Sequence, residues 1–277
     1  MRFLPAPFRR PVYLLSFFGI AALLLAAVLG AFYTPYDPLS LSVDARLQGP
    51  SWDHWLGTDH FGRDLLSRLL VGAAVSFRVS LATVTVALVL GVTLGTAAGY
   101  FRGLADRIVS SIIDAFLAMP GILLALALIA VIGPGELGVI AALGIAYTPN
   151  VARVVRGNVL SLRETNFVET AQIFGHPHWY ILWRHIVPHV GGPLTVLASA
   201  YFAQALLSES VLSFLGLGVP PPHPSWGGIL AEGRRFIADA PWLTIYPGLL
   251  IMISLFCINL LGDALRDYLD PRFEPAS

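Results

Sequence analysis

The sequence predicts an all-α integral membrane protein with six transmembrane helices. Of the 277 residues, 56% are hydrophobic and only 12% are charged, and the mean hydropathy is +0.73. A soluble domain carries roughly 25% charged residues. Half that fraction is too small to cover a water-facing surface, so we expect much of the surface to face lipid. Several charge-poor runs also approach the roughly 20 residues that a spanning helix needs.

Six such runs define the expected spans. They are Leu14–Tyr33, Val79–Phe101, Ala115–Gly135, Leu137–Ala152, Pro193–Leu217 and Pro241–Gly262. The fourth run is the shortest and ends at Arg153, and the fifth contains one acid, Glu209. The first run is longer than the apolar region of a signal peptide, which has roughly 7–15 residues. We therefore interpret it as an uncleaved anchor.

The runs divide the chain into two parts. Residues 1–70 are expected to form the first transmembrane helix and an extracytoplasmic segment, and residues 71–277 a five-helix core with a cytoplasmic segment at 154–192. Arg residues are more numerous on the side of the N-terminus, which by the positive-inside rule places both termini in the cytoplasm. The inside set is Arg2, Arg9, Arg10, Arg102, Arg107, Arg153, Arg156, Arg163, Arg184, Arg266 and Arg272. The outside set is Arg46, Arg63, Arg68, Arg78, Arg234 and Arg235.

The composition excludes several kinds of protein. The chain has no Lys, so it lacks both a Walker A lysine and a Schiff-base lysine and cannot be a P-loop ATPase by itself. Its net charge of zero indicates no nucleic-acid partner. The single cysteine, Cys257, permits no intrachain disulfide and no cysteine metal cluster. Neither G-x-S-x-G nor H-E-x-x-H occurs, so we expect no catalytic residues and no enzyme.

The polar segment 154–192 predicts a helix–turn–helix. The first helix ends at Gly175, which can take the C′ position. A second short helix fits His178–Val187 and ends at Pro188. Ala171 and Gly175 are four residues apart, so they are expected to share a face with Glu169 at its edge, where small side chains let a partner protein approach closely. Alternatively, the segment is an ordinary interfacial helix pair between two spans.

The same segment resembles the EAA motif of permeases in binding-protein-dependent ABC importers. That motif reads E-A-A, three residues, G, nine residues, I-x-L-P, and the spacing matches here. The residues in the segment are Glu169, Thr170, Ala171, Gly175, Arg184, His185, Ile186, Val187 and Pro188. Thr170 replaces the middle Ala of the motif, and His185 and Val187 replace its Ile and Leu. A histidine at this position is typical of the dipeptide, oligopeptide and nickel branch.

Two further segments resemble the same branch. The stretch from His54 to Arg68 is similar to H-x-L-G-T-D-x-x-G-R-D, and the stretch from Glu209 to Arg272 carries the Ser-Phe-Leu-Gly, Pro-Ser-Trp-Gly and Leu-Asp-Pro-Arg patterns. The resemblance covers nearly the whole chain from Leu14 onward. It is specific for the branch but does not single out one substrate.

The resemblance implies a type I ABC importer permease fold in a bacterial or archaeal plasma membrane. An extracytoplasmic binding protein would deliver di- or oligopeptides, and a second, related permease would form the path with this chain. Two cytosolic ATPase subunits would bind ATP and Mg and dock on Glu169–Pro188, and this chain would hold no cofactor of its own. Nickel or another small solute is the alternative substrate. An intramembrane enzyme or a secondary transporter is the alternative of another class, although both would need acids or histidines at the span centres.

Two polar residues in the spans, Glu209 and Asn259, are candidates for the path or an outer gate. A carboxylate within the membrane is costly and indicates a function, unless Glu209 snorkels to the interface. The chain has seven histidines, and six of them could suggest a metal site. We expect none, because four lie on the cytoplasmic segment and the family motif accounts for most of the outer group. They are His54, His60, His176, His178, His185 and His189.

Overall fold

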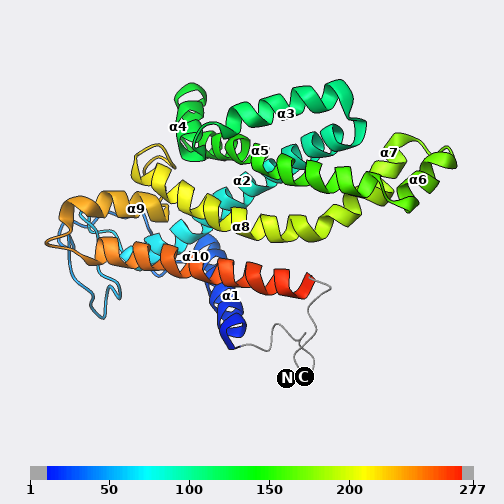
Figure 1. Ribbon diagram of the computed structural model, residues 1–277. Helices are drawn as coiled ribbons and strands as arrows, with labels where there is room; N and C mark the ends of the chain where they lie inside the picture. The colour runs from blue at the N-terminus through cyan, green and yellow to red at the C-terminus, as the bar shows by residue number, and fades with distance from the viewer. Residues whose placement is uncertain (1–10, 270–277) are drawn as a thin grey trace.

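The computed structural model describes residues 11–269, and every regular element in that range is a helix. The long helices pack against one another. They are α1 (Pro11–Phe32), α2 (Leu65–Phe101), α5 (Glu136–Arg163), α8 (Val187–Phe214) and α10 (Trp242–Leu269). In the view of Figure 1, α1 runs at a steep angle to α10. The shorter elements are α3 (Gly103–Leu117), α4 (Gly121–Ile132), α6 (Asn166–Ile173), α7 (His178–Ile181), a π-turn (Leu182–Ile186), α9 (Trp226–Gly233) and a 3₁₀ turn (Arg234–Phe236).

Five helices are long and apolar enough to cross a membrane, and α7 and α8 form one of them as a continuous helix of 37 residues. The pair α3 and α4 meets the same criterion together but is bent by 97° between its two helices. The chain is therefore an all-helical membrane protein with five to six candidate spans.

The third expected span, Ala115–Gly135, is wrong as a single helix. The chain breaks between α3 and α4, because Pro120 fixes its own φ and disfavours helical backbone at Met119. The helix before the break starts as early as Gly103 and includes charged residues. Asp106 forms a 2.5 Å ion pair with Arg156 of α5, so its charge is neutralised within the protein.

The second expected span is much longer than its charge-free run. Asp64 caps the N-terminus of α2, which then continues through two arginines that the expected run excluded. Arg68 is buried against acids, and Arg78 forms two 2.8 Å hydrogen bonds with the Glu136 carboxylate. The helix therefore begins at Leu65, and the expected boundary at residue 70 falls inside it.

The expectation that Pro188 ends a helix is also wrong. The π-turn places the Val187 N–H in a hydrogen bond with the Leu182 carbonyl, one residue farther back than in an α-helix. A wider turn of this kind accommodates a proline, which has no N–H to donate, without ending the helix. The chain consequently runs as one helix from His178 to Phe214.

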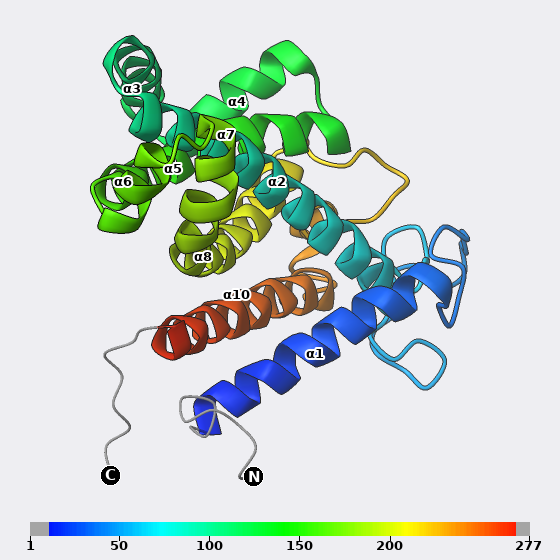
Figure 2. The ribbon, with the colours of Figure 1, turned by 90° about the vertical axis from the view of Figure 1, so that its right-hand side faces the viewer.

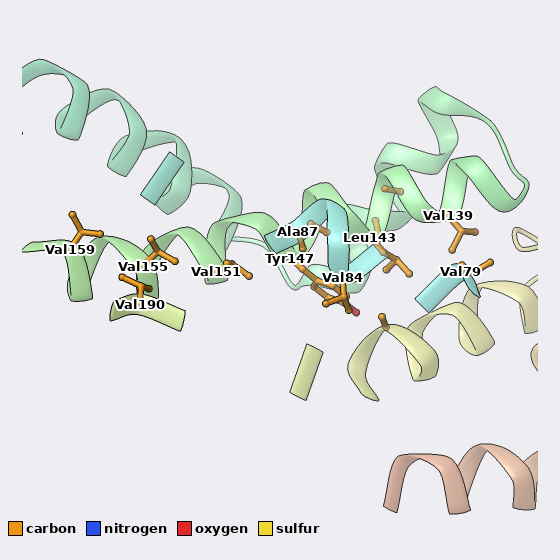
Figure 3. Close-up of a cluster of buried hydrophobic side chains, with 14 of the residues drawn as sticks. Val79, Val84, Ala87, Val139, Leu143, Tyr147, Val151, Val155, Val159 and Val190 are labelled. Atoms are coloured by element: carbon orange, nitrogen blue, oxygen red, sulfur yellow. The ribbon is translucent and has the colours of Figure 1, made fainter. Parts of the chain in front are cut away.

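The centre of the molecule is the contact between α2 and α5. Three glycines four residues apart on α2 face α5, and a Cβ atom built on Gly95 would lie 2.5 Å from the Ala152 carbonyl oxygen. Such spacing lets two helix backbones approach closely. The α5 side of this contact is drawn in Figure 3 and includes Val151, Val155 and Val159.

Both described ends of the chain lie at one end of the helix bundle. Figures 1 and 2 place the end of α10 on the side that carries α6 and α7, with residues 33–64 and α9 on the opposite side. The Tyr13 hydroxyl at the start of α1 donates a 3.1 Å hydrogen bond to the Asp267 carboxylate near the end of α10. Arg2, Arg9, Arg10 and Arg272 of the expected inside set lie outside the described residues.

Candidate coupling segment and outer charge network

Gly175 ends α6 as the sequence predicts. Its φ is +73°, a left-handed conformation that favours glycine. The Gly175 N–H donates to the Gln172 carbonyl at 2.9 Å, and the His176 N–H donates to the Ala171 carbonyl at 3.2 Å. These two bonds form a Schellman motif, which satisfies the last carbonyls of the helix.

The expected face shared by Ala171 and Gly175 does not form. Ala171 is only 6% exposed and packs in the interior, whereas Gly175 lies beyond the end of α6 with no atom within 4 Å of a Cβ built there. Large apolar side chains are exposed instead, at 65–78% of their surface. They are Ile173, Phe174, Trp179 and Trp183, which together we call the apolar tip.

The other residues of the expected coupling set lie on the same segment as the apolar tip. Glu169, Thr170, Arg184 and Pro188 are exposed, and the Thr170 hydroxyl donates to the carbonyl one turn back at 2.7 Å. His185 is half-buried beside an aromatic side chain of α7. The apolar tip could have been predicted from the sequence, because large apolar residues precede and follow Gly175 in a segment that was expected to be polar.

The coupling segment is firmly attached to α2 and α5. The Tyr100 hydroxyl, near the end of α2, lies 2.8 Å from Nδ1 of His178, and the Arg163 guanidinium donates to the Tyr100 carbonyl. Val168 and Ile181 are completely buried in the core cluster that includes the α5 valines. These contacts join the segment that carries the apolar tip to the ends of both long helices.

The histidines of this segment have separate partners. His178 contacts Tyr100, and His176 stacks on Tyr180 at a ring distance of 4.6 Å. His189 is 2.5 Å from the backbone carbonyl of His185 through its Nδ1. Each ring is engaged with an aromatic or backbone neighbour, which is the arrangement expected of structural histidines.

Glu209 does not snorkel to a surface. It is 1% exposed near the end of α8, and the Ser213 hydroxyl donates to its carboxylate at 2.7 Å. Ser76 of α2 and Ser225 before α9 lie close to the same carboxylate. The carboxylate is thus buried where three elements meet, at the end of the bundle opposite the apolar tip. Asn259, in contrast, is exposed on α10 and donates to its own helix at 2.8 Å, so the two candidates do not form one site.

A buried charge network holds residues 33–64 against the helices. Asp59 accepts from the Arg63 guanidinium at 2.6 Å and also pairs with Arg68. Both arginines reach Glu232 of α9, at 3.0 and 2.8 Å respectively. Burial alone would raise the pKa of Asp59, but the two guanidinium groups outweigh burial and hold that pKa below its usual value.

The helix α9 in this network was not expected from the sequence. Ser225 is the residue from which the start of α9 could have been predicted, because serine favours the N-cap position. Its hydroxyl accepts from the Gly228 N–H at 3.1 Å and caps the helix. Asp59, His60 and Glu232 also place potential metal-ligand atoms within 4.8 Å of one another. Both carboxylates are already neutralised by arginines, whose positive charge opposes a cation there.

Comparison with known proteins finds one matching protein family and several similar proteins. Residues 91–275 match the family described as binding-protein-dependent transport system inner membrane component. A putative peptide transport system permease protein of Brucella suis is 44% identical over 96% of this chain and 90% of its own length. A dipeptide transport system permease protein of Alkalihalophilus pseudofirmus is 41% identical over 92% of this chain and 84% of its own length.

The fold also has a counterpart among solved structures. An inward-facing methionine ABC transporter is similar with a TM-score of 0.59 and 18% identity, covering 73% of this chain and 96% of that one. At this level of identity the likeness concerns the fold alone. The family match and the two relatives agree across most of the chain, and the chain belongs to the family of multi-pass inner membrane components of binding-protein-dependent ABC transport systems.

Proposed function

We propose that this chain is one of two permease subunits of an ATP-driven importer of short peptides. The observation that carries the substrate class is the similarity, along more than nine tenths of the chain, to permeases named for peptide and dipeptide transport. The chain contributes to the path and to mechanical coupling, whereas ATP and Mg bind to separate ATPase subunits.

The permease has six spans in the type I arrangement, with α3 and α4 together forming one bent span and both termini in the cytoplasm. The common location of the described ends and the coupling segment supports this orientation. The arginine distribution supports it too, since Arg63 and Arg68 of the outside set are buried in an ion network and do not face lipid headgroups.

The apolar tip inserts into a groove on a cytosolic ATPase. Four large apolar side chains are exposed in this segment, and exposed apolar side chains of this kind mark a protein interface. Glu169, Thr170, Arg184 and His185 form its polar rim, Pro188 lies in the helix that follows, and Gly175 fixes the turn that presents it. The contact between His178 and Tyr100 carries ATP-driven movement into α2.

The opposite end of the bundle receives the binding protein. Residues 51–68 and 220–240 lie there, and the buried charge network joins the two segments. Binding-protein contact can therefore be sensed by α2 and α9 together. Glu209 closes this end as part of an outer gate, and Asn259 faces the second permease subunit or the path from α10.

Co-purification tests the importer proposal. The chain, co-expressed with its genomic neighbours, is solubilised and compared with Phe174→Asp and with a control variant, Ile237→Asp. Both side chains are exposed, at 77% and 61%, but only Phe174 belongs to the apolar tip. We expect an ATPase to co-purify with the wild type and the control and to be lost from Phe174→Asp. Association of an ATPase with all three proteins would contradict the docking site, and association with none would contradict the importer.

A further inference from the structure

A polar pocket lies among three membrane-spanning elements. Its volume is about 500 Å³, and it lies between α4, α5 and α8. Its polar lining residues are Tyr147, Asn150, Tyr201, Gln204 and Ser208. Gly121 and Ile122 at the start of α4 and Ala200 of α8 complete the wall. Polar groups gathered inside spans are costly and therefore indicate a function.

The pocket has a fixed base. Tyr147 is 6% exposed and donates a 2.7 Å hydrogen bond to the buried Ser208 hydroxyl, which links α5 to α8. Figure 3 shows the Tyr147 side chain extending from α5 towards α8. The Tyr201 ring lies 5.3 Å from the Tyr147 ring at a tilt of 40°. These contacts hold the two helix faces in register.

Other polar groups of the pocket remain available to a ligand. Among the described residues, the side chains of Asn150 and Tyr201 have no hydrogen-bond partner, and the Gln204 side chain lies beside the Tyr147 hydroxyl. Tyr201, Gln204 and Ser208 follow one another by three and four residues and so lie on one face of α8. The amides of Asn150 and Gln204 each offer both an N–H donor and a carbonyl acceptor, which is the complement of a peptide bond.

We infer that this pocket is a subsite of the path that binds the backbone of the transported peptide through uncharged side chains. The inference rests on the proposed peptide importer and gives its path a location. The volume lies within the roughly 300–1,000 Å³ typical of small-molecule pockets. Recognition of backbone groups, without a charged partner, suits peptides of varied sequence and allows release to either side.

The same lining disfavours a metal substrate. Divalent nickel prefers imidazole, thiolate or carboxylate ligands. The described residues that line the pocket contribute hydroxyl and amide groups and apolar side chains only. A pocket of this composition therefore favours the peptide members of the branch over the nickel members.

Transport measurements test the subsite in the assembled complex. The permease pair, the ATPases and the binding protein are reconstituted in proteoliposomes, and uptake of labelled dialanine is measured together with ATP hydrolysis. Asn150→Leu and Gln204→Leu are compared with Asn158→Leu, a control on α5 whose amide donates to the Val154 carbonyl. Because each pocket variant removes about one hydrogen bond, we expect uptake at subsaturating peptide to fall roughly 3- to 10-fold. Stimulation of ATP hydrolysis should persist, and the control should match the wild type.

Thiol labelling provides a readout that does not depend on transport. Gln204→Cys is introduced after Cys257, the single natural cysteine, is replaced by Ala. We expect saturating dialanine with the binding protein to slow labelling at position 204 and to leave Thr195→Cys on the same helix unaffected. If the wild-type complex imports no peptide, the proposed function itself fails. If the wild type imports dialanine but position 204 gains no protection and both Leu variants transport normally, only the subsite is overturned.

Discussion

Adding one methyl group at Gly95 should separate the two central helices. The new Cβ would lie 2.5 Å from the Ala152 carbonyl oxygen and 2.8 Å from Cβ of Val155, whereas ordinary van der Waals contacts begin at 3.4 Å. Restoring normal contact requires α2 to move away from α5 by about 1 Å, and a gap of that size removes roughly a quarter to a half of each dispersion contact.

The expected loss for Gly95→Ala is about 1–3 kcal/mol of unfolding free energy, the range for overpacked cores, reduced by up to about 1 kcal/mol from the higher helix propensity of Ala. Gly157→Ala on α5 is the matched control, because no atom lies within 4 Å of its added Cβ. This control should gain up to about 1 kcal/mol. Both variants are unfolded in mixed micelles and followed by tryptophan fluorescence. The reasoning about close helix approach is refuted if Gly95→Ala proves as stable as Gly157→Ala.

Three further predictions concern the two ends of the bundle. Replacing Arg68 by Met leaves Asp59 and Glu232 with one guanidinium between them, so the free energy of unfolding should fall by roughly 3–5 kcal/mol. The control Arg235→Met changes an exposed arginine and should alter the melting curve little, and equal melting curves for the two variants would contradict the network. Burial lowers the pKa of His60 below its ordinary 6.5, so the folded state binds fewer protons than the unfolded state and becomes less stable as pH falls below 6.5. In thermal melts between pH 7.5 and 5, His60→Phe, which cannot titrate, should lose less stability than the wild type, and an equal loss of stability would contradict this. Tyr100→Phe removes the hydroxyl that contacts His178, so the amount of peptide taken up per ATP hydrolysed should drop about 2- to 10-fold while the ATPase still binds. An unchanged ratio of uptake to ATP hydrolysis would exclude this contact from coupling.

The sequence located the spans better than it located their ends. A charge-free run is a sound marker of a span, yet α2 begins at Leu65 and contains Arg68 and Arg78. Their partners, Glu232 and Glu136, are distant in sequence, so the neutralisation that permits these charges could not be foreseen. The bend at residues 118–120 could have been predicted from Pro120, but the prediction of spans from hydropathy alone does not take proline into account.

The candidate sites show the same division between local and tertiary causes. The role of Gly175 as a helix terminator follows from local backbone conformation and was predicted. The orientation of Ala171 depends on which side of α6 packs against the core, and that prediction was wrong. The polar pocket was missed because Tyr147 and Gln204 converge only once α5 and α8 are placed side by side.

The continuous helix through Pro188 connects the apolar tip with the opposite end of the bundle. Its 37 residues span about 55 Å at 1.5 Å per residue, from beside the apolar tip to the buried Glu209 cluster. A tilt of about 5° around one end would displace the other by roughly 5 Å over that length. The π-turn at residues 182–186 lies close to the apolar tip, so a tilt of this helix would pivot near that end. In the proposed importer, a small rotation of the docked ATPase would thus become a large stroke at the outer mouth without any unfolding between them.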